Sequence, residues 1–345
     1  MDQKSQANIQ ALINKAIDDK FVFGISITVS QNDASLNFSA GNLSSSDRFF
    51  IASTTKLFTS SVIFQLVDEG KIQLADTLKE FFTAENLANL HNLDDIEAAK
   101  QITIEQLLSH TSGLADYFLQ KKDRQTLFDQ ITHEQDIGWN FDDVLERTKS
   151  IRSKFPPGQP GNAFYSDTNY QLLGKIIELI EGKPVADAFS ARVFKKLKLK
   201  NTYLFQGSKD PLLKNMYFKD KILKIPLAME SFGPDGGAVS TSSDLNVFIK
   251  AFFNGELFNK DHIEKGQVFN KIFFPLEYGI GFMRFKLPRI FSPFKPFPEL
   301  LGHSGHSGAF AFYSQEKDLA ICGTVNQIAK PSLSFQLLAK IISSL

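Results

Sequence analysis

Residues 49–56 read Phe-Phe-Ile-Ala-Ser-Thr-Thr-Lys and join the two patterns around which the fold is organised. A strand-like apolar run stops at Ser53, and apolar side chains at spacings of three to five then predict a helix that Gly70 ends. Ser53 is therefore expected at a helix N-terminus, where free N–H groups favour negative charge on its oxygen. Lys56 follows one turn later on the same face, where burial would lower its pKa and let it act as a base.

Serine and lysine at this spacing place a nucleophile and its activating group in one helical turn. The same short pattern is common, and a serine before a helix is usually only an N-cap. Residues 53–56 alone therefore leave catalysis and helix capping both open.

The composition is that of an ordinary globular protein. The chain has 345 residues, with 38 Lys+Arg and 38 Asp+Glu, so its formal net charge is zero. No charged block predicts a nucleic acid or an anionic lipid as partner. Cys322 is the only cysteine, which excludes an intrachain disulfide, and the six histidines lack metal-ligand spacing. We expect no cofactor and no metal.

The sequence contains no apolar run near the roughly 18 residues of a membrane span. Residues 1–6 lack the apolar core of a signal peptide. As it stands the chain is expected to be a cytoplasmic monomer, or a periplasmic or secreted protein if a leader has been removed.

Strand patterns are concentrated toward the two ends of the chain. They cover residues 21–30, 34–40, 278–285, 309–314 and 319–325, with expected helices at 7–20 and 334–343. The sequence between them is mostly helical and rich in loops.

These patterns predict an α/β (α+β) fold in which both termini build one antiparallel sheet flanked by helices. We assign residues 1–75 and 236–345 to this sheet domain and residues 76–235 to an inserted, mainly helical domain.

Two further motifs follow Ser53 in the chain. Residues 165–167 read Tyr-Ser-Asp before a helical pattern, and residues 303–305 read His-Ser-Gly. With Ser53-x-x-Lys56 in front of them, they resemble the serine penicillin-recognising family of class C β-lactamases, DD-carboxypeptidases, D-aminopeptidases and related esterases. The resemblance covers residues 8–345 and implies a β-lactamase/transpeptidase-like fold.

The resemblance implies catalytic roles for three residues. Ser53 would be the acylated nucleophile, Lys56 would accept its proton or tune its surroundings, and Tyr165 would pass a proton to the leaving group. The amine and the phenol are expected to titrate near neutrality as a coupled pair. A buried core tyrosine remains the alternative for Tyr165.

Substrate-binding roles are implied for Asp167, His303, Ser304, Gly305 and His306. The backbone N–H groups of Ser53 and His306 would form an oxyanion hole. A second His-Ser-Gly at 306–308 leaves the register open, and we favour the first copy. Helix capping by Asp167, and surface positions for both histidines, remain as alternatives.

Two positions depart from the family pattern. Asp167 stands where the family usually has asparagine, and its carboxylate would favour the charged form of Lys56 or meet a cationic substrate amine. His303 replaces a lysine, and histidine is mostly neutral above about pH 6.5. Both departures disfavour efficient β-lactam hydrolysis.

We therefore expect a serine acyl hydrolase that works through a covalent acyl-enzyme, with a D-alanyl-D-alanine carboxypeptidase-like peptidase or an esterase favoured. Its substrate would be an acyl ester, a D-amino-acyl peptide or a β-lactam. A class C-type β-lactamase and a non-catalytic β-lactam-binding sensor or scaffold are the alternatives. The phenylalanines of the Pro/Phe-rich segment 285–298 either wall the entrance of the site or pack on their own domain.

Overall fold

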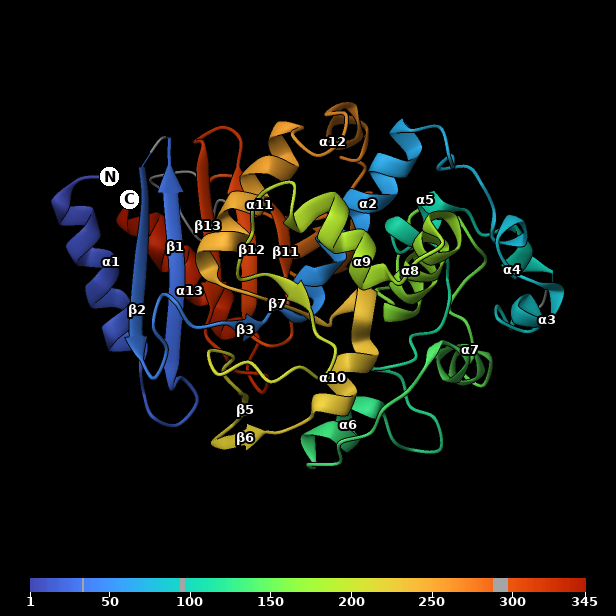
Figure 1. The fold of residues 1–345 in the computed structure, drawn as a ribbon, viewed down its shortest axis with the longest axis horizontal. Coiled ribbons are helices and arrows are strands. Elements are labelled where there is room, and N and C mark those ends of the chain that lie inside the picture. Colours follow the sequence, from blue (N-terminus) through green and yellow to red (C-terminus); the bar gives the residue numbers. More distant parts are fainter. Residues whose placement is uncertain (33, 94–96, 288–296) are drawn as a thin grey trace.

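An eight-stranded antiparallel sheet, in the order β2-β1-β13-β12-β11-β10-β9-β8, forms the centre of the computed structural model, which describes residues 1–32, 34–93, 97–287 and 297–345. Both ends of the chain contribute strands to it, which confirms the predicted fold class (Figure 1). The strands are β1 Gly24–Gln31, β2 Ala34–Gly41, β8 Asn270–Phe273, β9 Leu276–Tyr278, β10 Met283–Phe285, β11 Leu300–Ser304, β12 Ala309–Ser314 and β13 Leu319–Thr324.

Helices cover both faces of the central strands. Consecutive residues of β12 and β13 are buried, and side chains alternate between the two faces of a strand, so neither face is open to water. α11 (Ser242–Asn254) packs on β1, β12 and β13, while α1 (Gln3–Ala16) and α13 (Ser332–Ser344) pack against each other. In Figure 1, α11 lies in front of the sheet, and the two chain ends lie on the same side.

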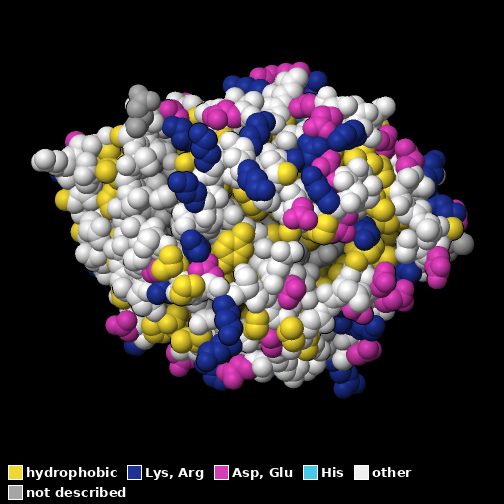
Figure 2. Space-filling view, in the orientation of Figure 1, with side chains coloured by type: hydrophobic (Ala, Val, Ile, Leu, Met, Phe, Trp, Pro, Cys, Tyr) yellow, Lys and Arg dark blue, Asp and Glu magenta, His cyan; other side chains and the backbone are white. Residues whose placement is uncertain are grey.

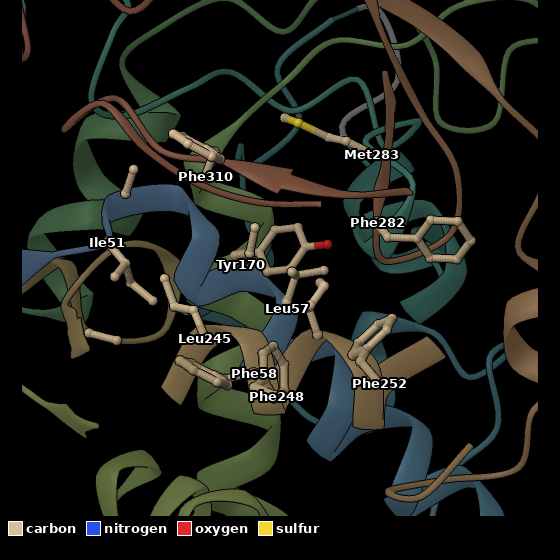
Figure 3. Packing of buried hydrophobic residues seen from close by; sticks show 14 of the residues in the cluster. Ile51, Leu57, Phe58, Tyr170, Leu245, Phe248, Phe252, Phe282, Met283 and Phe310 are labelled. Atoms are coloured by element: carbon tan, nitrogen blue, oxygen red, sulfur yellow. The ribbon is translucent and has the colours of Figure 1, made fainter. Parts of the chain in front are cut away.

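The stretch around Ser53 forms a short strand, a 3₁₀ turn and a buried helix. These are β3 (Phe49–Phe50), η1 (Ala52–Thr55) and α2 (Lys56–Asp68), and β3 pairs with β7 (Ala238–Ser240). The predicted helix start and its end before Gly70 are confirmed. Figure 3 shows Leu57 and Phe58 of α2 packed with Phe248 and Phe252 of α11.

The middle of the chain is mainly helical. Its elements are η2 Leu78–Glu80, α3 Ala84–Leu87, α4 Ala98–Gln101, α5 Ile104–Leu108, α6 Leu127–Thr132, α7 Phe141–Lys149, α8 Asp167–Glu181, α9 Val185–Phe189, η3 Ser190–Phe194, β4 Tyr203–Leu204, β5 Met216–Phe218, β6 Lys221–Leu223, α10 Pro226–Phe232 and η4 Gly233–Asp235; α12 Asp261–Lys265 follows later.

The hydrophobic residues form two clusters. The larger cluster runs from the sheet through α2 into α5, α8 and α9, so both predicted domains share it. The smaller cluster is built around α6, α10 and β5. The division of the chain at residues 75 and 235 stays a prediction.

The prediction of one strand over residues 278–285 is wrong. β9 and β10 pair with each other there, and Gly281 takes a left-handed φ of +84° in the connection between them. Phe285 is buried and Phe297 packs edge-on against it at 5.5 Å, whereas Phe291 and Phe294 lie outside the described residues.

The surface mixes both signs of charge. Acidic and basic side chains are interspersed over the face shown in Figure 2. None of the helices in the described parts of the chain is long and apolar enough to cross a membrane. The monomeric state stays a prediction.

Candidate active site

Ser53 lies where the end of β11 meets the start of α2. The preceding residue, Ala52, has a left-handed φ of +45°, a strained conformation for a residue with a side chain. A Cβ added to Gly305 would lie 2.2 Å from the carbonyl oxygen of Ile51, so only glycine allows the two segments to approach this closely. The second His-Ser-Gly copy forms the turn after β11, where the Gly308 N–H donates to the Gly305 oxygen at 3.0 Å.

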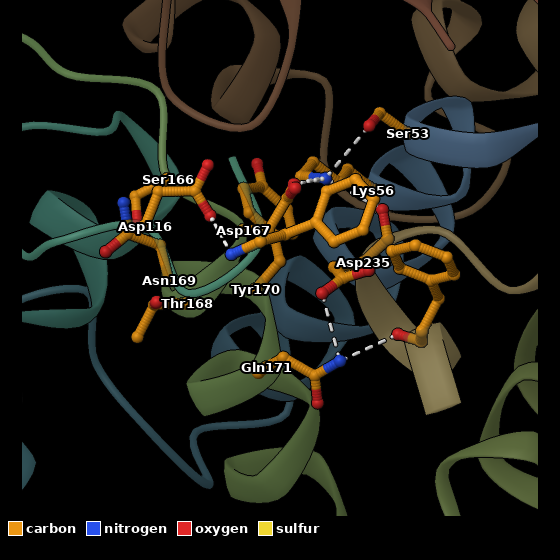
Figure 4. A network of polar contacts seen from close by, with 12 residues as sticks. Ser53, Lys56, Asp116, Ser166, Asp167, Thr168, Asn169, Tyr170, Gln171 and Asp235 are labelled. Carbon is orange, nitrogen blue, oxygen red and sulfur yellow. Dashed lines mark hydrogen bonds and ion pairs between the residues drawn. The ribbon is translucent and has the colours of Figure 1, made fainter. Parts of the chain in front are cut away.

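The ammonium group of Lys56 is buried, and its three hydrogens are all engaged (Figure 4). Nζ donates to Ser53 Oγ at 3.3 Å, to Asp167 Oδ1 at 2.6 Å and to the backbone oxygen of Asp235 at 2.7 Å. Burial lowers the pKa of Lys56, but the attraction of Asp167, Tyr165 and Asp235 outweighs burial and raises it. The expected lowering of this pKa is wrong, because the ion pair prevails.

Tyr165 faces the same cavity as Ser53. Lys56 Nζ lies 5.1 Å from the centre of its ring, and the phenol oxygen has no hydrogen-bond partner within the described residues. Burial raises the pKa of Tyr165, and the ammonium group offsets this only in part. The expectation that the amine and the phenol both titrate near neutrality is therefore wrong. The structure nevertheless brings the three expected catalytic side chains together.

Asp167 begins α8 with its carboxylate turned to Lys56 rather than to the helix backbone. Ser166 occupies the N-cap position, but its Oγ donates to the Ala115 oxygen at 2.9 Å, and neither side chain caps the helix. Asp167 lines the cavity, and in the described structure Lys56 is the single donor to its carboxylate. Its position in the first helical turn also favours negative charge.

Asp235 is a second acidic residue that lines this cavity. Its side chain is buried, and Oδ2 accepts hydrogen bonds from Tyr117 Oη at 2.8 Å and Gln171 Nε2 at 2.9 Å. Oδ1 has no partner among the described residues. Burial and the charge of Asp167 raise the pKa of Asp235 well above its ordinary value. Asp235 is not among the site residues predicted from the sequence, where its only signal is the glycine-rich turn at 233–237.

Asp116 is the third buried carboxyl group near Lys56. It accepts hydrogen bonds from the backbone N–H of Phe118 at 2.9 Å and of Leu119 at 3.4 Å, and it does not line the cavity. Burial and Asp167 raise the pKa of Asp116 to about 7. Asp116 is likewise not among the site residues predicted from the sequence.

The His303 side chain is in the core, not at the cavity. Its Nδ1 donates to the Ser304 oxygen at 2.7 Å, and Nε2 accepts from Tyr278 Oη at 3.1 Å. Burial lowers the pKa of His303 to about 3, so the ring is neutral. His303 is thus the one expected substrate-binding residue that is not among the described lining residues. The other four, Asp167, Ser304, Gly305 and His306, all line the cavity.

The cavity has a volume of about 230 Å³ and mostly apolar walls. Phe118, Ile131, Met229 and Phe232, all members of the smaller hydrophobic cluster, form much of its lining, and Met283 of β10 also contributes. Neither lysine nor arginine is found among the described lining residues. The described part of the chain also has no group of three or more His, Cys, Asp or Glu side chains that would hold a metal ion.

A serine at a helix start, with a lysine one turn on and a tyrosine opposite, matches the arrangement expected of a serine hydrolase of the penicillin-recognising type. The chain belongs to the Beta-lactamase family, whose profile matches residues 9–334. Members of this family are mostly serine hydrolases.

The relatives of this chain are distant. It is 33% identical over 157 residues to penicillin-binding protein 4 of Amycolatopsis lactamdurans, covering 44% of this chain and 34% of that one. It is 24% identical over 212 residues to the D-alanyl-D-alanine-carboxypeptidase/endopeptidase AmpH of Escherichia coli K12, covering 61% of this chain and 50% of that one. The chain thus spans between a third and a half of the length of these two relatives.

A solved structure matches nearly the whole chain. The crystal structure of a D-stereospecific amidohydrolase from Streptomyces sp. superposes with a TM-score of 0.81 at 25% identity, covering 98% of this chain and 97% of that one. This likeness confirms the β-lactamase-like fold.

Proposed function

We propose that this protein hydrolyses esters or amides of apolar acyl groups through a covalent acyl-enzyme on Ser53. The observation that carries this is the Ser53 Oγ, 3.3 Å from Lys56 Nζ, at a cavity that Tyr165 also lines. The apolar walls favour an acyl group with a large hydrophobic side chain.

The proposed reaction follows from the proton positions. Ser53 Oγ bonds to the acyl carbon while its proton passes to Lys56 in the free-base form, and Tyr165 relays a proton to the departing alcohol or amine. Water then cleaves the acyl-enzyme and regenerates the serine. The N–H groups of Ser53 and His306 are proposed to bind the oxyanion, which the close approach of β11 to Ser53 supports. Because Lys56 is held as an ammonium ion, the rate is expected to rise with pH.

A carboxypeptidase-like peptidase is the second candidate. The similarity to AmpH favours it. The absence of lysine and arginine from the described cavity lining disfavours it, because a substrate with a terminal carboxylate gains no cationic partner there. The lack of a cationic partner also disfavours a β-lactamase, because β-lactam substrates carry a carboxylate. A non-catalytic β-lactam sensor would require very slow deacylation.

Intact mass spectrometry and turnover assays test the proposal. The protein is incubated with a p-nitrophenyl ester, a D-alanyl-D-alanine peptide and a fluorescent penicillin. We expect the wild type to hydrolyse the ester and the Ser53→Ala variant to lose this activity completely. Ser166→Ala removes a buried hydroxyl that does not line the cavity and should leave turnover intact. Ester turnover that survives in Ser53→Ala, or no turnover and no adduct with any compound, would refute the proposal.

A further inference from the structure

Tyr165 lies in a segment without regular secondary structure. Residues 162–166 form neither helix nor strand, so the hydrogen-bond ladder of a helix or a sheet does not fix this side chain. Its phenol oxygen has no hydrogen-bond partner in the described structure either. A group that relays a proton must be placed accurately, because a displacement of about 1 Å can lower a rate about 100-fold. The position of the phenol must therefore be set by other contacts.

His110 contacts the residues on both sides of Tyr165. Its backbone oxygen accepts a hydrogen bond from the Phe164 N–H at 2.9 Å, and its Nδ1 accepts one from the Ser166 N–H at 3.1 Å. The His110 ring also lies against the phenol ring, with the centroids 4.4 Å apart and the planes tilted by 31°. The other described ring contacts of Tyr165 are at 6.0 Å or more.

The imidazole of His110 makes these contacts as a neutral ring. A backbone N–H can only donate, so Nδ1 carries a lone pair and Nε2 carries the proton. Asn169 Nδ2 lies 3.0 Å from the same Nδ1, and the Ser112 hydroxyl fixes this amide by donating to Asn169 Oδ1 at 2.7 Å. Burial and the charge of Lys56 lower the pKa of His110 well below its ordinary value, so the ring stays in its accepting form.

The backbone of His110 is in an unusual conformation that serves these contacts. Its φ of +58° is left-handed, which is uncommon for a residue with a side chain. In this conformation the carbonyl oxygen and the imidazole both bond to the segment that carries Tyr165. His110 is not among the described residues that line the cavity, so it has no contact with the substrate there.

We propose that His110 is the positioning residue that holds the Tyr165 phenol in line with the leaving group of the substrate. The inference rests on the proposed function and adds a residue that acts only through Tyr165. The Nδ1 acceptor fixes the backbone just after the tyrosine, and the ring supports the phenol from the side.

A displaced phenol would slow the step in which the leaving group takes up a proton. p-Nitrophenol departs as a stable anion and needs no proton, whereas ethanol departs only when a proton reaches its oxygen. p-Nitrophenyl butyrate and ethyl butyrate share one acyl group and differ in this need. Loss of the positioning contact should therefore affect the ethyl ester selectively, while general damage to the site would affect both esters.

Two variants separate the acceptor of His110 from its ring. His110→Phe keeps a ring and removes the acceptor, and it should lower kcat/KM about tenfold or more for ethyl butyrate but less than about threefold for p-nitrophenyl butyrate. His110→Asn carries an acceptor oxygen at the δ1 position and tolerates a left-handed φ, so it should restore most of the loss. His110→Ala, which lacks ring and acceptor, replaces the first variant should that fail to fold.

Two further variants serve as references. Tyr165→Phe should show the same selective loss for the ethyl ester. Ser109→Ala alters the residue next to His110, whose hydroxyl donates to the Glu105 oxygen at 2.7 Å, and should change neither ester.

Nuclear magnetic resonance gives a measurement that does not depend on catalysis. The chain has seven tyrosines, and with ¹³C at the tyrosine Cζ the signal of Tyr165 is the one that Tyr165→Phe removes. This signal should be single and sharp in the wild type and in His110→Asn, and should broaden or split in His110→Phe, because the phenol then takes more than one position. The Tyr313 signal should stay sharp throughout.

An equal loss for both esters, no loss for either, or a sharp Tyr165 signal in the variants that lack the acceptor would overturn the positioning role. Should the wild type hydrolyse neither ester, the proposed function is refuted, and the signal of Tyr165 alone decides whether His110 positions the phenol.

Discussion

Replacing Asp167 by asparagine is expected to raise the activity of this protein toward a neutral ester at pH 7. The change removes the charge that holds Lys56 as an ammonium ion and keeps the size of the side chain. The burial of Lys56 then acts with less opposition, so its pKa falls and more of it is present as the free base.

The size of the effect follows from the geometry of the ion pair. Nζ and Oδ1 are 2.6 Å apart, and both side chains are almost fully buried. Two unit charges about 4 Å apart at an effective dielectric constant of about 20 attract by about 4 kcal/mol, which corresponds to roughly 3 pKa units. The attraction of Asp235 remains in the variant and offsets part of this lowering of the pKa. A shift of about 1–3 units is therefore expected.

The assay is the pH profile of kcat/KM for p-nitrophenyl butyrate between pH 5 and 10. The acidic limb of Asp167→Asn should move to lower pH by about one unit or more, and kcat/KM at pH 7 should rise several-fold.

Ser166→Ala is the matched control, since it alters the neighbouring side chain without changing charge, and its profile should superpose on that of the wild type. A fall of about tenfold in kcat/KM for Asp167→Asn with an unshifted profile would refute the reasoning. That result would mean that the carboxylate itself takes part in proton transfer.

Three further predictions test the cavity, the core and a buried histidine. Met229→Trp should fill the cavity and lower kcat/KM for p-nitrophenyl octanoate about tenfold while sparing the acetate; equal loss for both esters would argue against an acyl pocket. Phe248→Ala removes a fully buried ring 4.3 Å from that of Phe58 and should lower the free energy of unfolding in urea by about 3–5 kcal/mol; a loss under about 1 kcal/mol would contradict the packing. His303 has a pKa of about 3 in the folded protein, below its unfolded value, so the unfolded chain binds the proton first as pH falls. The stability of the wild type relative to His303→Asn should therefore fall by about 1.4 kcal/mol per pH unit on acidification below about pH 6.5, and a flat difference would place the ring in water.

Features that depend on neighbouring residues could be read from the sequence. The helix that follows Ser53 is set by apolar periodicity, and Thr103 and Gln106, three residues apart, form a capping box at the start of α5. The hairpin of β1 and β2 and that of β12 and β13 also follow the predicted patterns. The break between β9 and β10 was missed, because the glycines that turn the chain stand inside a continuous strand-like run.

The features of the site also fall into those that short-range sequence predicts and those that depend on the fold. Ser53 and Lys56 share one helical turn, so four consecutive residues suffice to predict that their side chains meet. The charge on Lys56 cannot be predicted in this way, because it depends on Asp167 and Asp235, which stand 111 and 179 positions away in the chain. Burial alone would have made this lysine a base, and its carboxylate partner makes it an ammonium ion.

By itself, the sequence determined the order of the elements, the family resemblance and the identity of the candidate nucleophile with its lysine, because each rests on short-range periodicity and spacing. Only the tertiary structure decided which charge the lysine carries, that the His303 ring is in the core, and that segments distant in the chain enclose an apolar cavity lined in part by Asp167 and Asp235. The physical reason is that electrostatic and packing energies depend on distances in space, which the fold sets and local sequence does not.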